Sequence, residues 1–258
     1  MNSLKLFMIL VLGALVVGCN STDNTNDRAV DKIAAESKQA AIGVLLGSSS
    51  RLDEDKARDV GRKPAEVLVF LGIEQGMQVL DVIAASGYYT EVLSLAVGQS
   101  GRVYAQNPDF VLRMRDGSND KAMSARLENN RLGNVVRLDT ELEDLKLTEN
   151  SLDAAFTALN LHDVYNRSPE AAVDMLMNIK SLLKPGGIMG VIDHNGDVTQ
   201  DNNKLHRMTQ SQAVEVAKKA GFIVESSDLL VNPNDDRSQN VFANRGKTDR
   251  FVLKLTKP

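Results

Sequence analysis

The chain has 258 residues, which is enough for one large domain or two small ones. Hydrophobic residues make up 43% of it, so a full core is expected and disordered or fibrous classes are excluded. The formal net charge is −4 and the chain has no Trp. It therefore offers neither the positive charge nor the base-stacking platforms of a nucleic-acid-binding protein, and we expect no nucleic-acid partner.

The N-terminus resembles an export signal. Lys5 precedes a twelve-residue apolar run, Leu6–Val17, which is short for a membrane span. Val16-Val17-Gly18-Cys19 then resembles the processing box of bacterial lipoproteins, in which the cysteine is lipidated and becomes the first residue. We expect a signal peptide over residues 1–18 and a lipid anchor at Cys19 that attaches the protein to a membrane of the cell envelope, facing the periplasm. The alternatives are a buried structural cysteine or an uncleaved anchor.

Helices are predicted before the main domain. Residues 19–28 are polar and read as a flexible tether. Residues 29–46 have helical spacing, and residues 52–71 do too. Because Pro64 interrupts the second stretch, we expect two helices that meet near Lys63. We assign residues 29–76 to an N-terminal helical segment.

From residue 77 to residue 258, strand-like and helix-like segments alternate. A helix with a capping serine and a first-turn proline begins at Ser168, and a capping box at Thr209 begins another. Such alternation predicts a mainly parallel, doubly wound α/β sheet that is covered on both faces. The predicted strands are residues 77–83, 101–106, 134–139, 151–159, 187–193, 222–230 and 250–257.

Several motifs occur in an order that resembles the class I S-adenosylmethionine-dependent methyltransferases, over roughly residues 65–258. Val79–Gly87 stands where that family has its glycine-rich loop, Leu152-Asp153 opens the fourth strand, and Leu182–Gly187 (LLKPGG) is the turn before the fifth. The chain is most similar to a branch of predicted methyltransferases marked by GYYTEVL, VYAQN, a strand-end Asp-His and a Leu-His-Arg. The resemblance implies a seven-stranded sheet with the last strand reversed, S-adenosylmethionine as cofactor and a small-molecule acceptor.

The loop after the first strand is the expected cofactor site, because ligands of open α/β sheets bind at the carboxyl ends of strands. The resemblance implies that Asp81 orders this loop and meets the cofactor near its amino-acid end; the alternative is a carboxylate that caps the next helix. Gly87 would allow close approach of the ligand. Ile83 and Ala85 replace the usual glycines, and each would be strained by roughly 1–2 kcal/mol where the loop needs positive φ. We expect a remodelled loop or a weaker grip on the cofactor.

The second and third strands end in further candidates. Gln106-Asn107 stands where the family places an acid that pairs with the ribose hydroxyls, and Asp109 is close enough in sequence to substitute. Asp139 matches an acid that meets the adenine amino group, although a surface turn residue is an equal alternative. The full set implied to bind the cofactor is Asp81, Ala85, Gly87, Tyr88, Gln106, Asn107, Asp139 and Asn160.

The three histidines fall at or near the same predicted sheet edge. His162 follows the fourth strand, His194 ends the fifth, and His206 lies in the next loop. Methyl transfer needs alignment of donor and acceptor, and a histidine can take a proton from an oxygen or nitrogen acceptor. We predict His162 and His194 as candidates for that base, with Asp163 or Asp193 fixing the tautomer. A metal site of the histidines and an Asp is a weaker alternative, because no tight H-x₃-H spacing supports it, and we predict no metal.

Other charged residues indicate ordinary surface. We expect Arg126 and its neighbours on a solvated face. Asp235–Arg237 and Thr248–Arg250 could bracket a loop over the cleft, and ordinary turns are the favoured interpretation.

The leading hypothesis is therefore an exported, lipid-anchored methyltransferase. It contains a tension, because the cofactor is made in the cytosol. A non-catalytic methyltransferase fold that binds another small ligand is the first alternative. A hydrolase or isomerase is weaker, since no nucleophile elbow is present.

Overall fold

The structure is a computed structural model that describes residues 23–258, with side chains from Ala29 onward. The predicted signal peptide and Cys19 lie outside the described residues. The chain divides into two units, residues 1–37 and 38–258, and helix α1 (Asp23–Leu46) spans the division. It begins within the stretch expected as a tether, so residues 23–28 are helical. None of the helices in the described part has the length and apolarity needed to cross a membrane.

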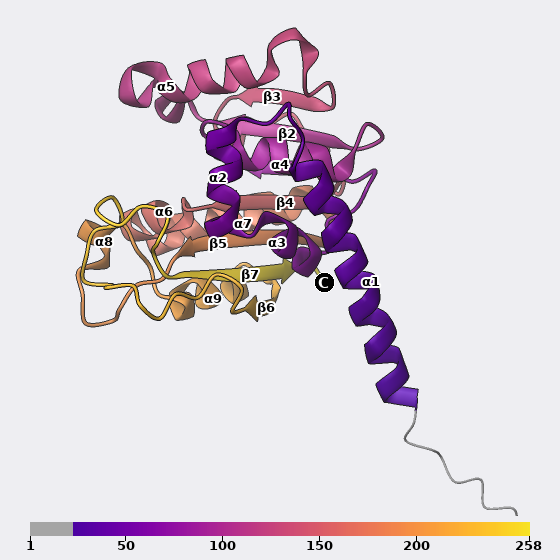
Figure 1. The fold of residues 1–258 in the computed structure, drawn as a ribbon. Coiled ribbons are helices and arrows are strands. Elements are labelled where there is room, and N and C mark those ends of the chain that lie inside the picture. Colours follow the sequence, from indigo (N-terminus) through magenta and orange to yellow (C-terminus); the bar gives the residue numbers. More distant parts are fainter. Residues whose placement is uncertain (1–22) are drawn as a thin grey trace, which may run out of the picture. The chain divides into compact units, whose positions relative to one another are not determined.

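The second unit is built on a seven-stranded sheet with the order β3-β2-β1-β4-β5-β7-β6 (Figure 1). All neighbours are parallel except β7, which runs antiparallel to both β5 and β6. The prediction of a doubly wound sheet with a reversed last strand is confirmed. The strands are β1 (Gln78–Val82), β2 (Arg102–Asn107), β3 (Val135–Asp139), β4 (Leu152–Ala158), β5 (Leu183–His194), β6 (Ile223–Ser227) and β7 (Arg250–Thr256).

Helices cover both faces of the sheet, and each face has its own apolar core. Residues of α3 and α4 pack in one core, and residues of α7 and α9 pack in the other. The helices of this unit beyond α1 are α2 (Asp53–Arg62), α3 (Pro64–Leu71), α4 (Tyr88–Val97), α5 (Asp109–Leu127), α6 (Leu161–Arg167), α7 (Pro169–Leu182), α8 (Asn202–Leu205) and α9 (Gln210–Lys219), with short 3₁₀ turns η1 (Glu128–Asn130) and η2 (Leu142–Asp144).

Local signals set several helix ends as predicted. Lys63 lies between α2 and α3 in the left-handed region, with φ 45°, and Pro64 opens α3. The Ser168 side chain accepts a hydrogen bond from Ala171 N and caps α7. Thr209 and Gln212 form a capping box at the start of α9. The caps of α7 and α9 satisfy backbone N–H groups that a helix start leaves unpaired, and Pro64 has no N–H to leave unpaired.

Two elements differ from the prediction. The turn expected at Lys184–Gly187 is an irregularity inside β5: Leu152 pairs with Leu183, whereas Ala154 pairs with Ile188. Helix α5 starts at Asp109, earlier than predicted, and a break with positive φ at residues 115–117 divides it into two parts.

Arg126 of α5 is buried, which corrects the prediction of a solvated face. It is 5% exposed, and its guanidinium pairs with Asp55 of α2 at 2.7 Å and with Glu91 of α4. Its Nε donates to the carbonyl of Ser86 at 3.1 Å. This ion-pair cluster therefore joins α2, α4 and α5 around the loop that follows β1.

Candidate active site

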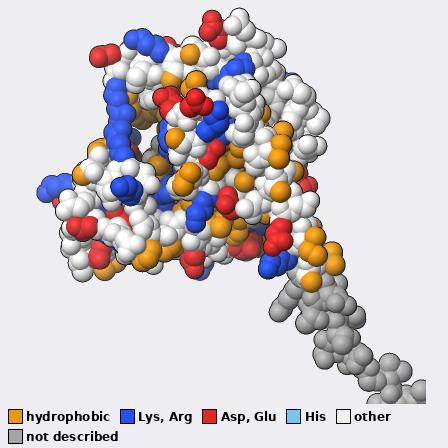
Figure 2. Space-filling model, in the orientation of Figure 1, with side chains coloured by type: hydrophobic (Ala, Val, Ile, Leu, Met, Phe, Trp, Pro, Cys, Tyr) orange, Lys and Arg blue, Asp and Glu red, His pale blue; other side chains and the backbone are white. Residues whose placement is uncertain are grey.

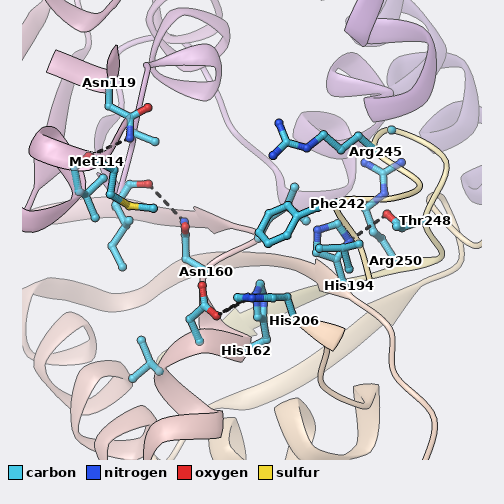
Figure 3. A pocket seen from close by; sticks show the side chains of 18 of the residues that line it. Met114, Asn119, Asn160, His162, His194, His206, Phe242, Arg245, Thr248 and Arg250 are labelled. Atoms are coloured by element: carbon cyan, nitrogen blue, oxygen red, sulfur yellow. Dashed lines mark hydrogen bonds and ion pairs between the residues drawn. The ribbon is translucent and has the colours of Figure 1, made fainter. Parts of the chain in front are cut away.

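One cavity of about 960 Å³ lies at the carboxyl ends of β4 and β5 (Figure 3). Its walls come from α2, the loop after β1, the start of α5, the β4–α6 connection, the end of β5 and the segment before β7. This is the edge at which open α/β sheets bind ligands, near the reversal of strand order between β1 and β4. The volume lies in the range of small-molecule and cofactor sites. Figure 2 shows the hollow on this face, with Lys and Arg side chains along part of its rim.

The loop after β1 keeps a glycine-type backbone without the glycines. Ile83 has φ 55° and Ala85 has φ 50°, both in the left-handed region, and both line the cavity. The expected strain is therefore present, at roughly 1–2 kcal/mol per residue. Gly87 has φ 84°, and a Cβ there would lie 2.9 Å from Met123 Cε, so only glycine fits at that position.

Two buried amides hold this loop in its conformation. The Oε1 atom of Gln106 accepts a hydrogen bond from Ile83 N at 3.0 Å, and the Oδ1 atom of Asn107 accepts one from Ala85 N at 2.7 Å. Their amide nitrogens donate to Thr140 O and Ala85 O. Neither side chain lines the cavity. In this structure both side chains position the loop, and their contact with a ribose stays a prediction.

Asp81 lies behind the same loop. It is 2% exposed, and its Oδ2 accepts a hydrogen bond from Thr90 Oγ1 in α4 at 2.6 Å. Burial raises the pKa of Asp81 to about 7, and the Thr90 hydroxyl offsets part of that rise. Asp81 does not line the cavity. The carboxyl group joins β1 to the first turn of α4 through the Thr90 side chain and does not cap the helix, so its contact with the cofactor stays a prediction.

Some of the other predicted cofactor residues line the cavity and others do not. Tyr88 is buried and its hydroxyl donates to Asp59 at 2.5 Å, and Gly87 lies under Met123; neither lines the cavity. Asp139 is exposed and pairs with Arg137 at 2.7 Å, away from the cavity. Ala85 and Asn160 do line it. The Asn160 amide donates to the carbonyls of Ile83 and Ala158, at 3.2 Å and 2.9 Å, and so ties the loop to the end of β4.

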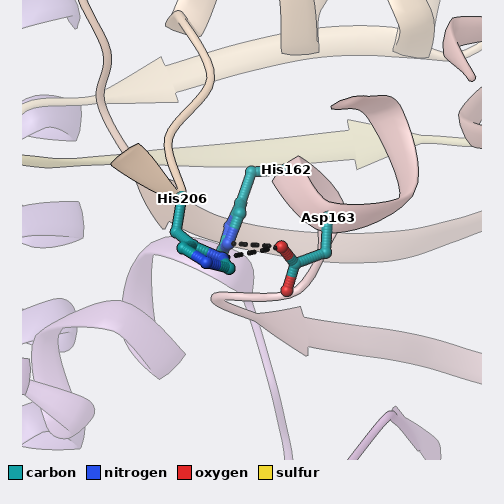
Figure 4. A group of neighbouring side chains, drawn as sticks. All are labelled: His162, Asp163 and His206. Carbon is teal, nitrogen blue, oxygen red and sulfur yellow. Dashed lines mark hydrogen bonds and ion pairs between the residues drawn. The ribbon is translucent and has the colours of Figure 1, made fainter. Parts of the chain in front are cut away.

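The three histidines meet in the cavity wall, as predicted. The ring of His162 lies 5.8 Å from that of His194 and 5.8 Å from that of His206, measured between centroids. The Nδ1 atom of His162 lies 2.7 Å from Asp193 Oδ1, and its Nε2 lies 3.2 Å from Asp163 Oδ1. The Nδ1 atom of His206 lies 3.0 Å from the same Asp163 oxygen (Figure 4).

These surroundings give the two candidate bases different charge states. Burial lowers the pKa of His162, but the charges and hydrogen bonds of Asp193 and Asp163 outweigh burial and raise it to about 10. His162 is then an imidazolium at neutral pH and cannot take a proton. Burial lowers the pKa of His194 to about 3, so His194 is neutral, with its Nδ1 2.9 Å from Thr248 Oγ1. Asp193 accepts a hydrogen bond from the backbone N–H of His194, at 2.7 Å, whereas its contact with a histidine ring is to His162.

His162, Asp163 and His206 also satisfy the geometry of a cation site. Their candidate ligand atoms all lie within 4.8 Å of one another, which the sequence spacing did not indicate. A metal ion bound there would have to displace the proton that His162 Nε2 carries beside Asp163. In the described structure, the three side chains form a hydrogen-bond network around Asp163.

The segment before β7 covers part of the cavity, which the favoured interpretation as ordinary turns did not predict. Val241, Phe242 and Thr248 line the cavity. The buried guanidinium of Arg207 anchors the segment, since it pairs with Asp235 at 2.8 Å and donates to Gln239 O at 3.2 Å. In the Leu-His-Arg motif, His206 thus lines the cavity, and Arg207 anchors the segment that covers part of it.

Comparison with known proteins was made against sequences and structures. The chain is 31% identical over 185 residues, 68% of each sequence, to the ubiquinone/menaquinone biosynthesis C-methyltransferase UbiE of Shewanella pealeana. The chain belongs to the class I S-adenosylmethionine-dependent methyltransferases. The UbiE of Idiomarina loihiensis is 27% identical over 137 residues, and this match spans 52% of the chain and 49% of that relative. No protein-family profile matches the chain.

Solved structures agree on the fold of the methyltransferase. A crystal structure of an S-adenosylmethionine-dependent methyltransferase from Aquifex aeolicus superposes with a TM-score of 0.57 at 21% identity, over 81% of this chain and 100% of that one. The residues present fit S-adenosylmethionine, the cofactor of this family, because the cavity wall offers it apolar side chains and the backbone of the loop. Ile83 and Ala85 would meet it from the loop after β1 and Asn160 from the start of α6, and Phe110 and Met114 of α5 offer apolar surface to its base. Among the described lining residues, Asp163 is the one acid, and it lies on the histidine side.

Proposed function

We propose that this chain transfers a methyl group from S-adenosylmethionine to a small acceptor, and that it does so as an exported protein anchored by lipid at Cys19. The observation that supports the reaction is a shared cavity: the strained loop at Ile83 and Ala85 faces the same space as the three histidines. A cofactor on the loop and an acceptor beside the histidines would lie in one enclosed volume. Holding two reactants in that way is the main source of rate in an in-line displacement.

The histidines favour an acceptor that reacts in its ionised form. A general base works best when its pKa lies near the working pH, and neither His162 nor His194 has such a pKa. The His162 imidazolium, however, would stabilise an oxyanion in the partly buried wall. Neutral His194, oriented by Thr248, would hydrogen-bond the acceptor. We therefore assign His162 and His194 to stabilising and orienting the acceptor.

A hydroxylated ring is the acceptor class that we propose. Phe242 presents apolar surface on the histidine side of the cavity, where its ring lies 4.8 Å from that of His206, measured between centroids, and flat rings pack well on such a side chain. The relatives from Shewanella and Idiomarina are named for methylation in quinone biosynthesis, which is compatible with a ring of this kind.

A binding module without catalysis is the second candidate. It is supported by the left-handed conformations of Ile83 and Ala85, because the strain of a loop without its usual glycines weakens the grip on a cofactor. Export would also separate the protein from the cytosol, where the cofactor is made, and this too favours the binding module.

Calorimetric titration of the full-length chain in detergent tests the reaction. We expect binding of both S-adenosylmethionine and S-adenosylhomocysteine. Failure of both to bind at millimolar concentration would overturn the methyltransferase proposal. Binding without transfer of a labelled methyl group to any hydroxylated ring offered would favour the binding module.

Anchoring is tested separately, in cells given radiolabelled palmitate. We expect the label on the wild-type chain and none on Cys19→Ser, which should also leave the membrane fraction. Label that persists on Cys19→Ser would contradict the anchoring proposal without affecting the proposal about the reaction.

A further inference from the structure

The cavity carries far more positive than negative charge, although the whole chain is acidic. Against the single acid Asp163, its described lining residues include six arginines. Within the described part of the chain, only one of the six forms an ion pair, Arg58 with Asp55. The six are Arg58, Arg62, Arg115, Arg167, Arg245 and Arg250.

Arg250 is the most unusual of them, because it is buried without an acid partner. It is 6% exposed, and it opens β7 opposite His194 in the β5–β7 register. Its Nη2 donates to the carbonyl of Gly61 at 2.6 Å, whereas its Nε has no partner in the described structure. Leaving a guanidinium in such surroundings costs several kcal/mol, so the site is incomplete without an anion.

Asp249, the acid next to Arg250 in sequence, already has other partners. Asp249 accepts a hydrogen bond from Arg237 at 2.6 Å and another from the Asn195 amide at 3.0 Å. Figure 3 shows the Arg250 side chain beside Thr248 and His194, at the cavity wall. A ligand is therefore the available counter-charge for Arg250.

Two further arginines flank this position on aromatic rings. The guanidinium carbon of Arg62 lies 4.2 Å from the centroid of Tyr88, and that of Arg245 lies 5.1 Å from the centroid of Phe242. A guanidinium that stacks through its face keeps its N–H edge available for a carboxylate or phosphate. Burial lowers the pKa of Arg250, and repulsion from the Arg62 charge adds to that effect. Arg62, Arg245 and Arg250 all line the cavity.

We propose that the acceptor is an anion: a small hydroxylated ring that carries a carboxylate or phosphate group, which Arg250 binds and which Arg62 and Arg245 help to hold. The inference rests on the proposed methyl transfer and adds the acceptor's charge. As a whole, S-adenosylmethionine is net positive, because its carboxylate is balanced by its ammonium group and its sulfonium adds a charge, so it does not neutralise the arginines of the cavity. Within the sheet, β4 and β5 lie between β1, which leads into the loop, and β7, which begins at Arg250, so cofactor and acceptor would occupy different parts of the one cavity.

The test compares two probes of the same shape, 4-hydroxybenzoate and its neutral analogue 4-hydroxybenzamide, by calorimetry on the full-length chain in detergent with S-adenosylhomocysteine present. We expect the benzoate to bind at least tenfold more tightly than the benzamide, and inorganic phosphate to compete with it. Equal affinity for the two probes would overturn the proposal, and so would failure of both benzoate and phosphate to bind.

Variants separate this site from the cofactor site. Arg250→Met should weaken benzoate at least tenfold and leave the affinity for S-adenosylhomocysteine unchanged. The control Arg102→Met removes the same charge from an exposed position outside the cavity and should change neither. If Arg250→Met does not fold by circular dichroism, the exposed Arg245→Met replaces it, with an expected loss of at least threefold. Equal loss of benzoate and S-adenosylhomocysteine would mean that the arginine holds the cofactor, and would overturn the proposal.

The proposed function can fail independently of this one. If benzoate binds as described while neither S-adenosylmethionine nor S-adenosylhomocysteine binds, the anion site stands and methyl transfer falls. If S-adenosylhomocysteine binds and the benzoate and the benzamide bind equally tightly, the proposal of methyl transfer is supported and the proposal of an anionic acceptor is contradicted.

Discussion

The Nδ1 atom of His162 lies 2.7 Å from the Oδ1 atom of Asp193, and both side chains are buried at the end of β5. The other Asp193 oxygen accepts the backbone N–H of His162 at 2.8 Å. One carboxylate therefore fixes both the ring and the start of α6. Because Asp163 approaches the far nitrogen of the same ring, the imidazolium is held between two acids and carries fixed positive charge into the cavity wall.

Replacing Asp193 should be costly. Asp193→Asn removes the charge that pairs with buried His162, and losing one partner of a buried pair costs about 3–5 kcal/mol of unfolding free energy. Urea denaturation at pH 6 measures the loss. Asp163→Asn is the matched control, because the Asp163 side chain is 56% exposed, and we expect it to cost less than about 1 kcal/mol. Equal losses would show that Asp193 is not the dominant partner.

The same pair predicts a pH dependence. A histidine whose folded pKa is raised from 6.5 to about 10 contributes stability that is fully present below pH 6.5 and is lost as the pH rises towards 10. The difference in unfolding free energy between wild type and Asp193→Asn should therefore shrink between pH 6.5 and 10. A difference that stays constant over this range would contradict the assignment of charge to His162.

The two neighbouring histidines should be distinguishable by NMR. At pH 7, nitrogen shifts of labelled imidazoles should report a cationic His162 and a neutral His194. His194 has a pKa lowered to about 3, so its contribution to stability is present above pH 6.5 and is lost as the pH falls towards 3. His194→Gln and His162→Gln assign the signals. A His194 signal that titrates near pH 6.5 would show that its ring is more hydrated than the structure indicates.

Asp81 gives a third pH signature. Its pKa is raised from 3.8 to about 7, so the folded state binds the proton more tightly than the unfolded chain. The stability linked to that proton is present below pH 3.8 and is lost as the pH rises through 7. Asp81→Asn keeps a partner for Thr90 and cannot ionise, so its stability relative to wild type should increase from pH 4 to pH 7. Urea titrations of both proteins at several pH values provide the measurement.

The strain in the loop after β1 can be relieved one residue at a time. Ala85→Gly should be neutral or stabilise the protein by up to about 1 kcal/mol, because the roughly 1–2 kcal/mol cost of φ 50° outweighs the entropy that glycine adds to the unfolded chain. Ala84→Gly is the control one residue away: Ala84 is not among the positive-φ positions, so the change should cost about 0.5–1 kcal/mol. Thermal unfolding of both variants decides between them, and a destabilised Ala85→Gly would mean that the strain is compensated elsewhere.

The sequence was sufficient for the architecture because its signals are local and repeated. Alternating apolar strands and helices, Pro64, Ser168 and the Thr209 capping box each act through residues close in the chain, and the structure has the corresponding elements. Positive φ at Ile83 and Ala85 was also expected, from the place of the loop in a familiar order of motifs.

The site was only partly predictable, because its decisive contacts are long-range. The motif placed Gln106 and Asn107 at a ligand, whereas their hydrogen bonds go to a loop more than twenty residues away in sequence. The pKa of His162 is raised and that of His194 is lowered, and this difference depends on which ring meets Asp193. The sequence indicated only a turn at Thr248–Arg250, whereas the interpretation of Arg250 as a ligand-binding residue depends on the pairing of β7 with β5 and on the lack of an acid partner for it in the described structure.

A last prediction concerns the coupling between acceptor and cofactor. S-adenosylmethionine has a net charge of +1 and S-adenosylhomocysteine has none, so a cavity lined by unpaired arginines should disfavour the former until an anion is bound. Saturating 4-hydroxybenzoate should therefore raise the affinity for S-adenosylmethionine about fivefold, near 1 kcal/mol of coupling, and raise that for S-adenosylhomocysteine less. Because coupling is reciprocal, S-adenosylmethionine should tighten benzoate binding by the same factor. The two calorimetric titrations check each other. In Arg250→Met the coupling should fall, since the charge that the anion neutralises has been removed, and coupling that persists there unchanged would place the responsible charge elsewhere in the cavity.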